Sequence, residues 1–217
     1  MVTFNFQKIR NALFWGLSIL VALVAWRFIP LGVEASMDFM AHHIEPRALA
    51  LYAHIGVAPL VLFLLPFQFS VDLRIRRPKL HRWFGRIYAV GVLVSGVASL
   101  PLAAHTSGGP VAGLGFAVLA VLWMGVTAQA VRLAMQGRLA AHRIWMIRSA
   151  ALTFAGVTLR LELPLLAMPL GIDLGYQVVA WACWIPNAIL AEWMIRRNVA
   201  PSKTVAKPVA KTVEGAG

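Results

Sequence analysis

Two histidine–arginine pairs are the residues of this chain whose type and spacing best suit chemistry. His81-Arg82 and His142-Arg143 each lie at the start of a long apolar run, and they are 61 residues apart. Imidazole can ligate a haem iron, and guanidinium pairs well with carboxylates such as haem propionates. Both pairs also suit a simpler role, in which they bind phospholipid headgroups at a membrane surface.

Three further polar residues lie within or at the ends of apolar runs. His54 is well inside the run 47–69, where an ionisable side chain is a functional candidate by default. The alternative is a neutral histidine that hydrogen-bonds between helices. Gln68 and Gln129 each lie near one end of a run, and they suit either a substrate pathway or hydrogen bonds between helices.

The composition indicates that these apolar runs lie in a membrane. The chain is 60% hydrophobic and 13% charged, with a mean hydropathy of +0.75. The net charge of +12 does not indicate nucleic acid, because the basic residues lie at alternate boundaries between apolar runs. The one cysteine, Cys183, excludes an intramolecular disulfide and a cysteine-rich metal site.

Six apolar runs are long enough to cross a bilayer, and they predict an all-α membrane protein with one six-helix domain over residues 1–199. The predicted spans cover about 11–29, 47–69, 83–104, 111–135, 144–163 and 175–195. Residues 200–217 are rich in Lys, Ala, Val and Pro without apolar periodicity, which predicts a disordered cytoplasmic tail. The His42-His43-x-Glu45 cluster is interpreted as an interfacial turn rather than a metal site, because adjacent histidines point to different sides of a helix.

The distribution of basic residues predicts the orientation. Alternate assignment of the loops puts 17 of the 20 Lys and Arg residues on one side and only Arg27, Arg47 and Arg160 on the other. The positive-inside rule then places both termini in the cytoplasm and the chain in a bacterial cytoplasmic membrane.

A shift of 61 residues reveals an internal repeat. It aligns Gln68 with Gln129, Arg77 with Arg138, His81 with His142, and Arg82 with Arg143. The shift lays spans two and three over spans four and five, which predicts a four-helix core built from a parallel two-helix repeat. His81 would face His142 at the cytoplasmic side. His54 aligns with Gly115, so His105 at the end of span three is the possible partner of His54 at the other side.

The run His54-Ile55-Gly56, Gln68 and the two His-Arg motifs resemble a bacterial family of predicted membrane proteins of unknown function (domain-of-unknown-function family twenty-three-oh-six) over about residues 47–163. That resemblance implies a membrane location and no established activity. The core topology also looks like the two-haem b-type cytochromes, in which histidines on spans two to five ligate one haem near each surface. This second resemblance implies His54, His81 and His142 as ligands, with His105 replacing the ligand that Gly115 cannot supply.

Three functions are compatible with these residues. The first is electron transfer through haem b, exchanging electrons with a quinone or a redox partner, with the propionates neutralised by Arg77, Arg82, Arg143 or Arg148. The second is a small transporter or ligand-binding protein that uses His54 as a proton or substrate site and attracts an anion such as a phosphate or carboxylate. The third is a structural or accessory membrane protein without a cofactor. No P-loop, dinucleotide fingerprint, His-Glu-x-x-His or nucleophile elbow occurs, so no enzyme class is indicated, and the oligomeric state is open.

Overall fold

The computed structural model describes residues 6–199, so the predicted disordered tail 200–217 lies outside the described residues. The described part is helical and contains no strand. Its elements are α1 (Phe6–Ala25), α2 (Phe28–Leu31), α3 (Val33–Ser36), the 3-10 helix η1 (Asp38–His43), α4 (Ala48–Phe69), α5 (Val71–Arg76), α6 (Pro78–Ala104), α7 (Gly109–Met135), α8 (Leu139–Thr153), α9 (Ala155–Leu170), α10 (Ile172–Ala182) and α11 (Ile185–Val199).

The prediction of an all-α protein with six membrane spans is confirmed. Six helical segments are long and apolar enough to cross a membrane: Gln7–Leu31, Ala48–Phe69, Pro78–Ala104, Gly109–Met135, Leu139–Leu170 and Ile172–Arg197. Several boundaries differ from the predicted ones by a few residues, and two of these differences have a clear cause. The third span begins at Pro78 rather than Trp83, because proline is well suited to the first turn of a helix. The fifth extends to Leu170 through Pro164, since membrane helices tolerate proline where neighbours satisfy the backbone.

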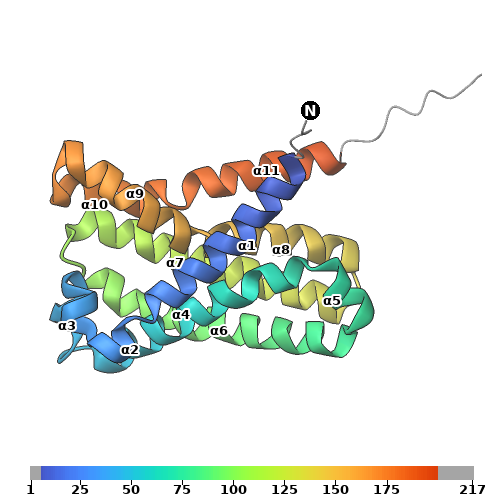
Figure 1. Cartoon of the computed structure of the whole chain (residues 1–217), viewed down its shortest axis with the longest axis horizontal. Helices are drawn as coiled ribbons and strands as arrows, with labels where there is room; N and C mark the ends of the chain where they lie inside the picture. The colour runs from blue at the N-terminus through green and yellow to red at the C-terminus, as the bar shows by residue number, and fades with distance from the viewer. Residues whose placement is uncertain (1–5, 200–217) are drawn as a thin grey trace, which may run out of the picture.

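Four of the spans form the core (Figure 1). α4 packs on α6, α6 on α7, and α7 on α8. α1 crosses α4, α10 packs on α7 and α9, and α11 packs on α8. We call the end that carries α5 and the α7–α8 turn the basic end, and the end that carries α2, α3 and the α9–α10 turn the opposite end.

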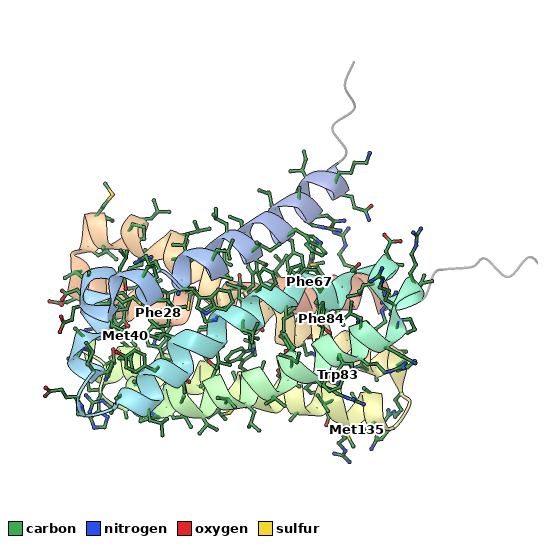
Figure 2. The ribbon with its side chains drawn as sticks, turned by 60° about the horizontal axis from the view of Figure 1, so that its bottom comes forward. Phe28, Met40, Phe67, Trp83, Phe84 and Met135 are labelled. Carbon is green, nitrogen blue, oxygen red and sulfur yellow. The ribbon has the colours of Figure 1, made fainter. Side chains whose placement is uncertain are left out.

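The side chains distinguish these two ends (Figure 2). Trp83 and Met135 lie at the basic end, whereas Phe28 and Met40 lie at the opposite end. Between the ends, Phe67 of α4 meets Phe84 of α6 in an edge-to-face contact with ring centroids 5.6 Å apart. This aromatic contact helps to hold α4 against α6, the two helices of the first repeat.

The two halves of the repeat start in the same way. Arg77 precedes α6 and Arg138 precedes α8, and each accepts the backbone N–H of the histidine four residues later, at 3.0 Å for His81 and 2.9 Å for His142. Further along the same helices, the Tyr88 hydroxyl of α6 lies 2.8 Å from Ser149 Oγ of α8, and these residues are 61 positions apart. Residues related by a two-fold repeat can touch only at the repeat axis, so the axis passes through this hydrogen bond.

A buried polar network surrounds that hydrogen bond. The Tyr88 hydroxyl also contacts Thr153 Oγ1 at 2.6 Å, and Ser149 Oγ contacts Thr127 Oγ1 at 2.7 Å. Trp123 Nε1 donates to Thr153 Oγ1 at 2.9 Å. All five side chains are buried. The network therefore ties α6, α7 and α8 together at the centre of the core.

The small residues of α6 permit its close approach to both neighbours. A Cβ at Gly91 would lie 2.6 Å from Val61 Cγ2 of α4, and a Cβ at Gly96 would lie 2.5 Å from Met124 Cγ of α7. Both distances are shorter than van der Waals contact. Small residues at membrane helix interfaces serve this purpose generally.

Replacing Tyr88 by Phe removes two buried hydrogen bonds without opening a cavity. We expect Tyr88→Phe to lower the stability of the detergent-purified protein by about 1–3 kcal/mol, seen as a lower melting temperature. Tyr52→Phe is the matched control, because Tyr52 is 46% exposed. Equal melting temperatures for Tyr88→Phe and the unchanged protein would contradict the role of the network.

Candidate functional site

A cavity of about 630 Å³ lies among α1, α4, α6, α7, α9 and α10, towards the opposite end. Its walls follow the internal repeat, because seven pairs of lining residues are related by the shift of 61 positions. These pairs are Ile55 with Phe116, Ala58 with Leu119, Pro59 with Ala120, Leu62 with Trp123, Ser99 with Arg160, Leu102 with Leu163, and Ala103 with Pro164. The cavity therefore lies on the repeat axis.

The buried polar network borders this cavity. Trp123 and Thr153 belong to the network and also line the cavity. Towards the basic end, the tightly bonded hydroxyls of Tyr88, Ser149 and Thr127 continue along the axis. The cavity thus has a hydrogen-bonded wall on the side of the basic end, and the rest of its lining is mostly apolar with a few polar side chains.

His54 is the lining residue that the sequence singled out. Its Nδ1 lies 3.1 Å from the Ser95 carbonyl oxygen and 3.0 Å from Ser95 Oγ. Donation from Nδ1 to the carbonyl leaves Nε2 as the acceptor of a neutral ring. Ser95 is fully buried, so α6 fixes the orientation of the ring. His54 can therefore offer one acceptor to a molecule in the cavity.

Two arginines supply the charge of the cavity. Arg27 donates from Nε and Nη2 to the Ser36 carbonyl oxygen, and Arg160 donates from Nη1 to the Gly156 carbonyl oxygen at 2.8 Å. No Asp or Glu is among the lining residues. Arg47, the third basic residue assigned to this side, donates to His43, and His43 lines the cavity. All three arginines of the opposite end therefore lie in or next to the cavity.

His43 closes the cavity at the opposite end as a neutral ring. It accepts a hydrogen bond from Arg47 Nε at 2.7 Å and is 1% exposed. Burial, with the neighbouring charges of His42, Arg47 and His105, lowers the pKa of His43 to about 4. His42 packs against His43 and reaches the His105 carbonyl oxygen at 3.1 Å. In residues 6–199, no group of three metal-binding side chains occurs, here or elsewhere.

The predicted pair His81 and His142 occupies one layer at the basic end. Each lies seven residues, or two helical turns, before the hydrogen-bonded Tyr88 and Ser149 on its helix. His142 Nδ1 is 2.8 Å from the Ala130 carbonyl oxygen, whereas the buried His81 Nδ1 has no partner among the described residues.

The other residues predicted to form a site at the basic end do not gather around His81 and His142. Arg77, Arg82 and Arg143 are exposed, and Arg148 forms a bidentate ion pair with Glu192 of α11. Gln68 lies over Gly85, with Nε2 buried and unpartnered in the described part, and Gln129 is half-buried on α7. Neither His81 nor His142 lines the cavity.

The structure does not bring His54 and His105 together. His54 contacts Ser95, ten residues before His105 on α6 and so about 15 Å away by helical rise. His105 Nδ1 instead lies 2.9 Å from the Pro101 carbonyl oxygen. Gly115 on α7 is the counterpart of His54, and α10 packs closely against it. A Cβ at Gly115 would lie 2.9 Å from the Ala180 carbonyl oxygen, which leaves no room there for a ligand. These residues do not fit a haem near the opposite end.

Sequence reasoning missed the two arginines of the cavity and the hydroxyl network. Arg27 and Arg160 were assigned only to the poorly charged side of the membrane, and Tyr88, Thr127 and Ser149 were not singled out. One signal was available, since the repeat shift that aligned the histidines also aligns Tyr88 with Ser149 and Ser99 with Arg160. Polar residues at positions related by the repeat shift are therefore candidates for contacts at the repeat axis.

The low pKa of His43 predicts a dependence of stability on pH. An unfolded histidine titrates near 6.5 and the folded one near 4, so the unfolded chain binds more protons between these values. The stability that His43 controls is therefore present above about pH 6.5 and is lost as the pH falls to about 4. We expect a lower melting temperature at pH 5 than at pH 7.5.

His43→Gln is the control for this titration, because glutamine keeps a hydrogen-bond acceptor for Arg47 and does not titrate in this range. The difference in melting temperature between pH 5 and pH 7.5 should become smaller in this variant. An unchanged difference would show that other groups cause it.

The comparisons with known proteins agree with the membrane fold. No curated protein and no solved structure matches the chain. The family of predicted membrane proteins DUF2306 matches residues 51–195, which includes α4, α6, α7, α8, α9 and α10 in nearly their full lengths. The matched region therefore contains the repeat, the hydroxyl network and most of the cavity. This chain belongs to the family of predicted membrane proteins DUF2306.

Proposed function

We propose that this protein binds a small, largely apolar molecule in the cavity on the repeat axis, with His54 as a polar contact. The observation that carries the proposal is the cavity of about 630 Å³ whose walls come from equivalent positions of both repeats. Ligand sites in proteins fall within about 300–1,000 Å³ and are mostly apolar with a few placed polar groups. The cavity meets each of these criteria.

The polar groups favour binding over a purely structural role. Intramembrane ionisable residues usually pair with one another, whereas His54, Arg27 and Arg160 face a common space without a carboxylate. A parallel repeat with the site at its interface is also an arrangement that transporters use. Binding followed by transport is thus one form of the same proposal.

A cavity-filling substitution tests the proposal. Ala58→Trp places a large side chain into the cavity from α4, and Val94→Trp on α6 is the control, because Val94 is 42% exposed. We expect native mass spectrometry of the gently purified protein to show a bound small molecule, retained in Val94→Trp and lost in Ala58→Trp. An unchanged protein free of bound molecules, or equal occupancy in both variants, would contradict the proposal.

The orientation of the chain is part of the proposal. The excess of Lys and Arg at the basic end supports a cytoplasmic location for that end, so the cavity would lie towards the outside. Cys183 is buried, so a single new cysteine can report the side. We expect a membrane-impermeant maleimide to label Ser107→Cys in intact spheroplasts and Gln136→Cys only after lysis. The reverse pattern would invert the topology.

A single haem b at the basic end is the second candidate. The observation that favours it is the shared layer of His81 and His142, with His142 Nδ1 bonded to a carbonyl oxygen so that Nε2 is free. Bound haem would supply one-electron chemistry. A Soret band in the purified protein that disappears in His142→Ala would support this candidate, and a spectrum without that band would exclude it.

A further inference from the structure

Arg27 and Arg160 carry a charge that the described part of the protein does not neutralise. The ion pairs among residues 6–199 are Arg76 with Asp72 and Arg148 with Glu192, and neither involves the cavity. Arg27 and Arg160 bond only to backbone carbonyl oxygens. A guanidinium group has five N–H donors, so each arginine keeps donors that these bonds do not use.

The two charges also share one site. Arg27 and Arg160 both line the cavity, and its lining contains no carboxylate. Two like charges that share a site repel each other, and a counter-charge placed between them is favourable. An oxyanion in the cavity would accept the free donors of both arginines and remove the repulsion.

The remainder of the cavity fits an apolar chain. Ile55, Leu62, Phe116 and Leu119 line it, together with further aliphatic residues from α1 and α9. An inorganic anion would leave this apolar surface unused. A ligand that satisfies both regions has an anionic head and an apolar body.

The cavity also reaches the lipid-facing side of the molecule. Leu20 and Val24 of α1 line the cavity and are 58% and 43% exposed, and Arg160 of α9 is exposed as well. α1 and α9 therefore border an opening rather than a closed wall. A molecule dissolved in the bilayer can enter the cavity sideways, without passing through water.

We propose that the ligand of this cavity is an anionic amphiphile, a long apolar chain with a carboxylate or phosphate head, whose head binds to Arg27 and Arg160. This inference rests on the proposed function and specifies its ligand class. Charge-assisted hydrogen bonds to guanidinium hold the head, and burial of the chain along α4 and α7 supplies the apolar contact.

The experiment compares three probes by native mass spectrometry on delipidated protein. Oleate carries a charged head, oleyl alcohol has the same chain with a neutral head, and phosphatidylglycerol represents the membrane lipids. We expect oleate or phosphatidylglycerol to bind at least 10-fold more tightly than oleyl alcohol. Preference for oleate indicates a free single-chain acid as the source, and preference for phosphatidylglycerol indicates a lipid headgroup.

Arginine substitutions locate the binding energy. Arg160→Gln and Arg27→Gln should each weaken binding of the preferred anion by about 10-fold or more and leave oleyl alcohol unchanged, since a hydrogen bond to a charged group is lost. Arg160→Lys should retain most of the affinity. Arg86→Gln at the basic end is the matched control and should bind all three probes normally.

The melting temperature of the empty protein separates a ligand role from a structural one. Removal of an uncompensated charge should leave the melting temperature of empty Arg160→Gln unchanged or raise it, whereas loss of a structural arginine should lower it. Equal binding of oleate and oleyl alcohol, or unaltered binding in both glutamine variants, would overturn the anionic ligand and leave the cavity proposal standing. Failure of all three probes to bind would overturn both.

Discussion

The hydrogen bond between Tyr88 and Ser149 is the contact on which the arrangement of the core depends. It joins repeat-related positions at 2.8 Å, so it fixes the two helix pairs about a common axis. Thr127, Thr153 and Trp123 complete the network, and these buried side chains satisfy one another's hydrogen bonds. In lipid there is little hydrophobic force between helices, so close packing and hydrogen bonds of this kind set their positions.

The axis separates two environments. Towards the basic end, His81 and His142 lie in one layer, two helical turns before Tyr88 and Ser149, and each is followed by an exposed arginine. Towards the opposite end, the helices enclose the cavity, and α4 and α9 lack the close contact that α4 makes with α6. The repeat axis thus passes through hydrogen-bonded hydroxyls towards one end and through the cavity towards the other.

Differences between the two repeats determine which polar side chains line the cavity. Ser99 of the first repeat corresponds to Arg160 of the second, and Leu62 corresponds to Trp123. His54 has Gly115 as its counterpart, and the glycine allows α10 to approach α7 closely. Differences at equivalent positions therefore place His54 and Arg160 in an otherwise mostly apolar space, and Arg27 joins them from the segment that follows α1.

Apolar run length and the repeat shift predicted much of the fold. They identified six spans and the four-helix core, because these depend on composition and local spacing. The structure does not pair His54 with His105, because His54 contacts Ser95 of α6, ten residues before His105, whereas His105 turns to the Pro101 carbonyl oxygen. The cavity could not be predicted either, since the space left between α4 and α9 depends on how all six helices fit together.

An experimental structure of the protein in native lipid nanodiscs is the most direct test of the account. The predicted result is an elongated density in the cavity, with one end between Arg27 and Arg160 and the remainder along Leu62 and Leu119. A cavity closed by contact between α4 and α9, or one that holds only water with both arginines turned to the surface, would contradict it.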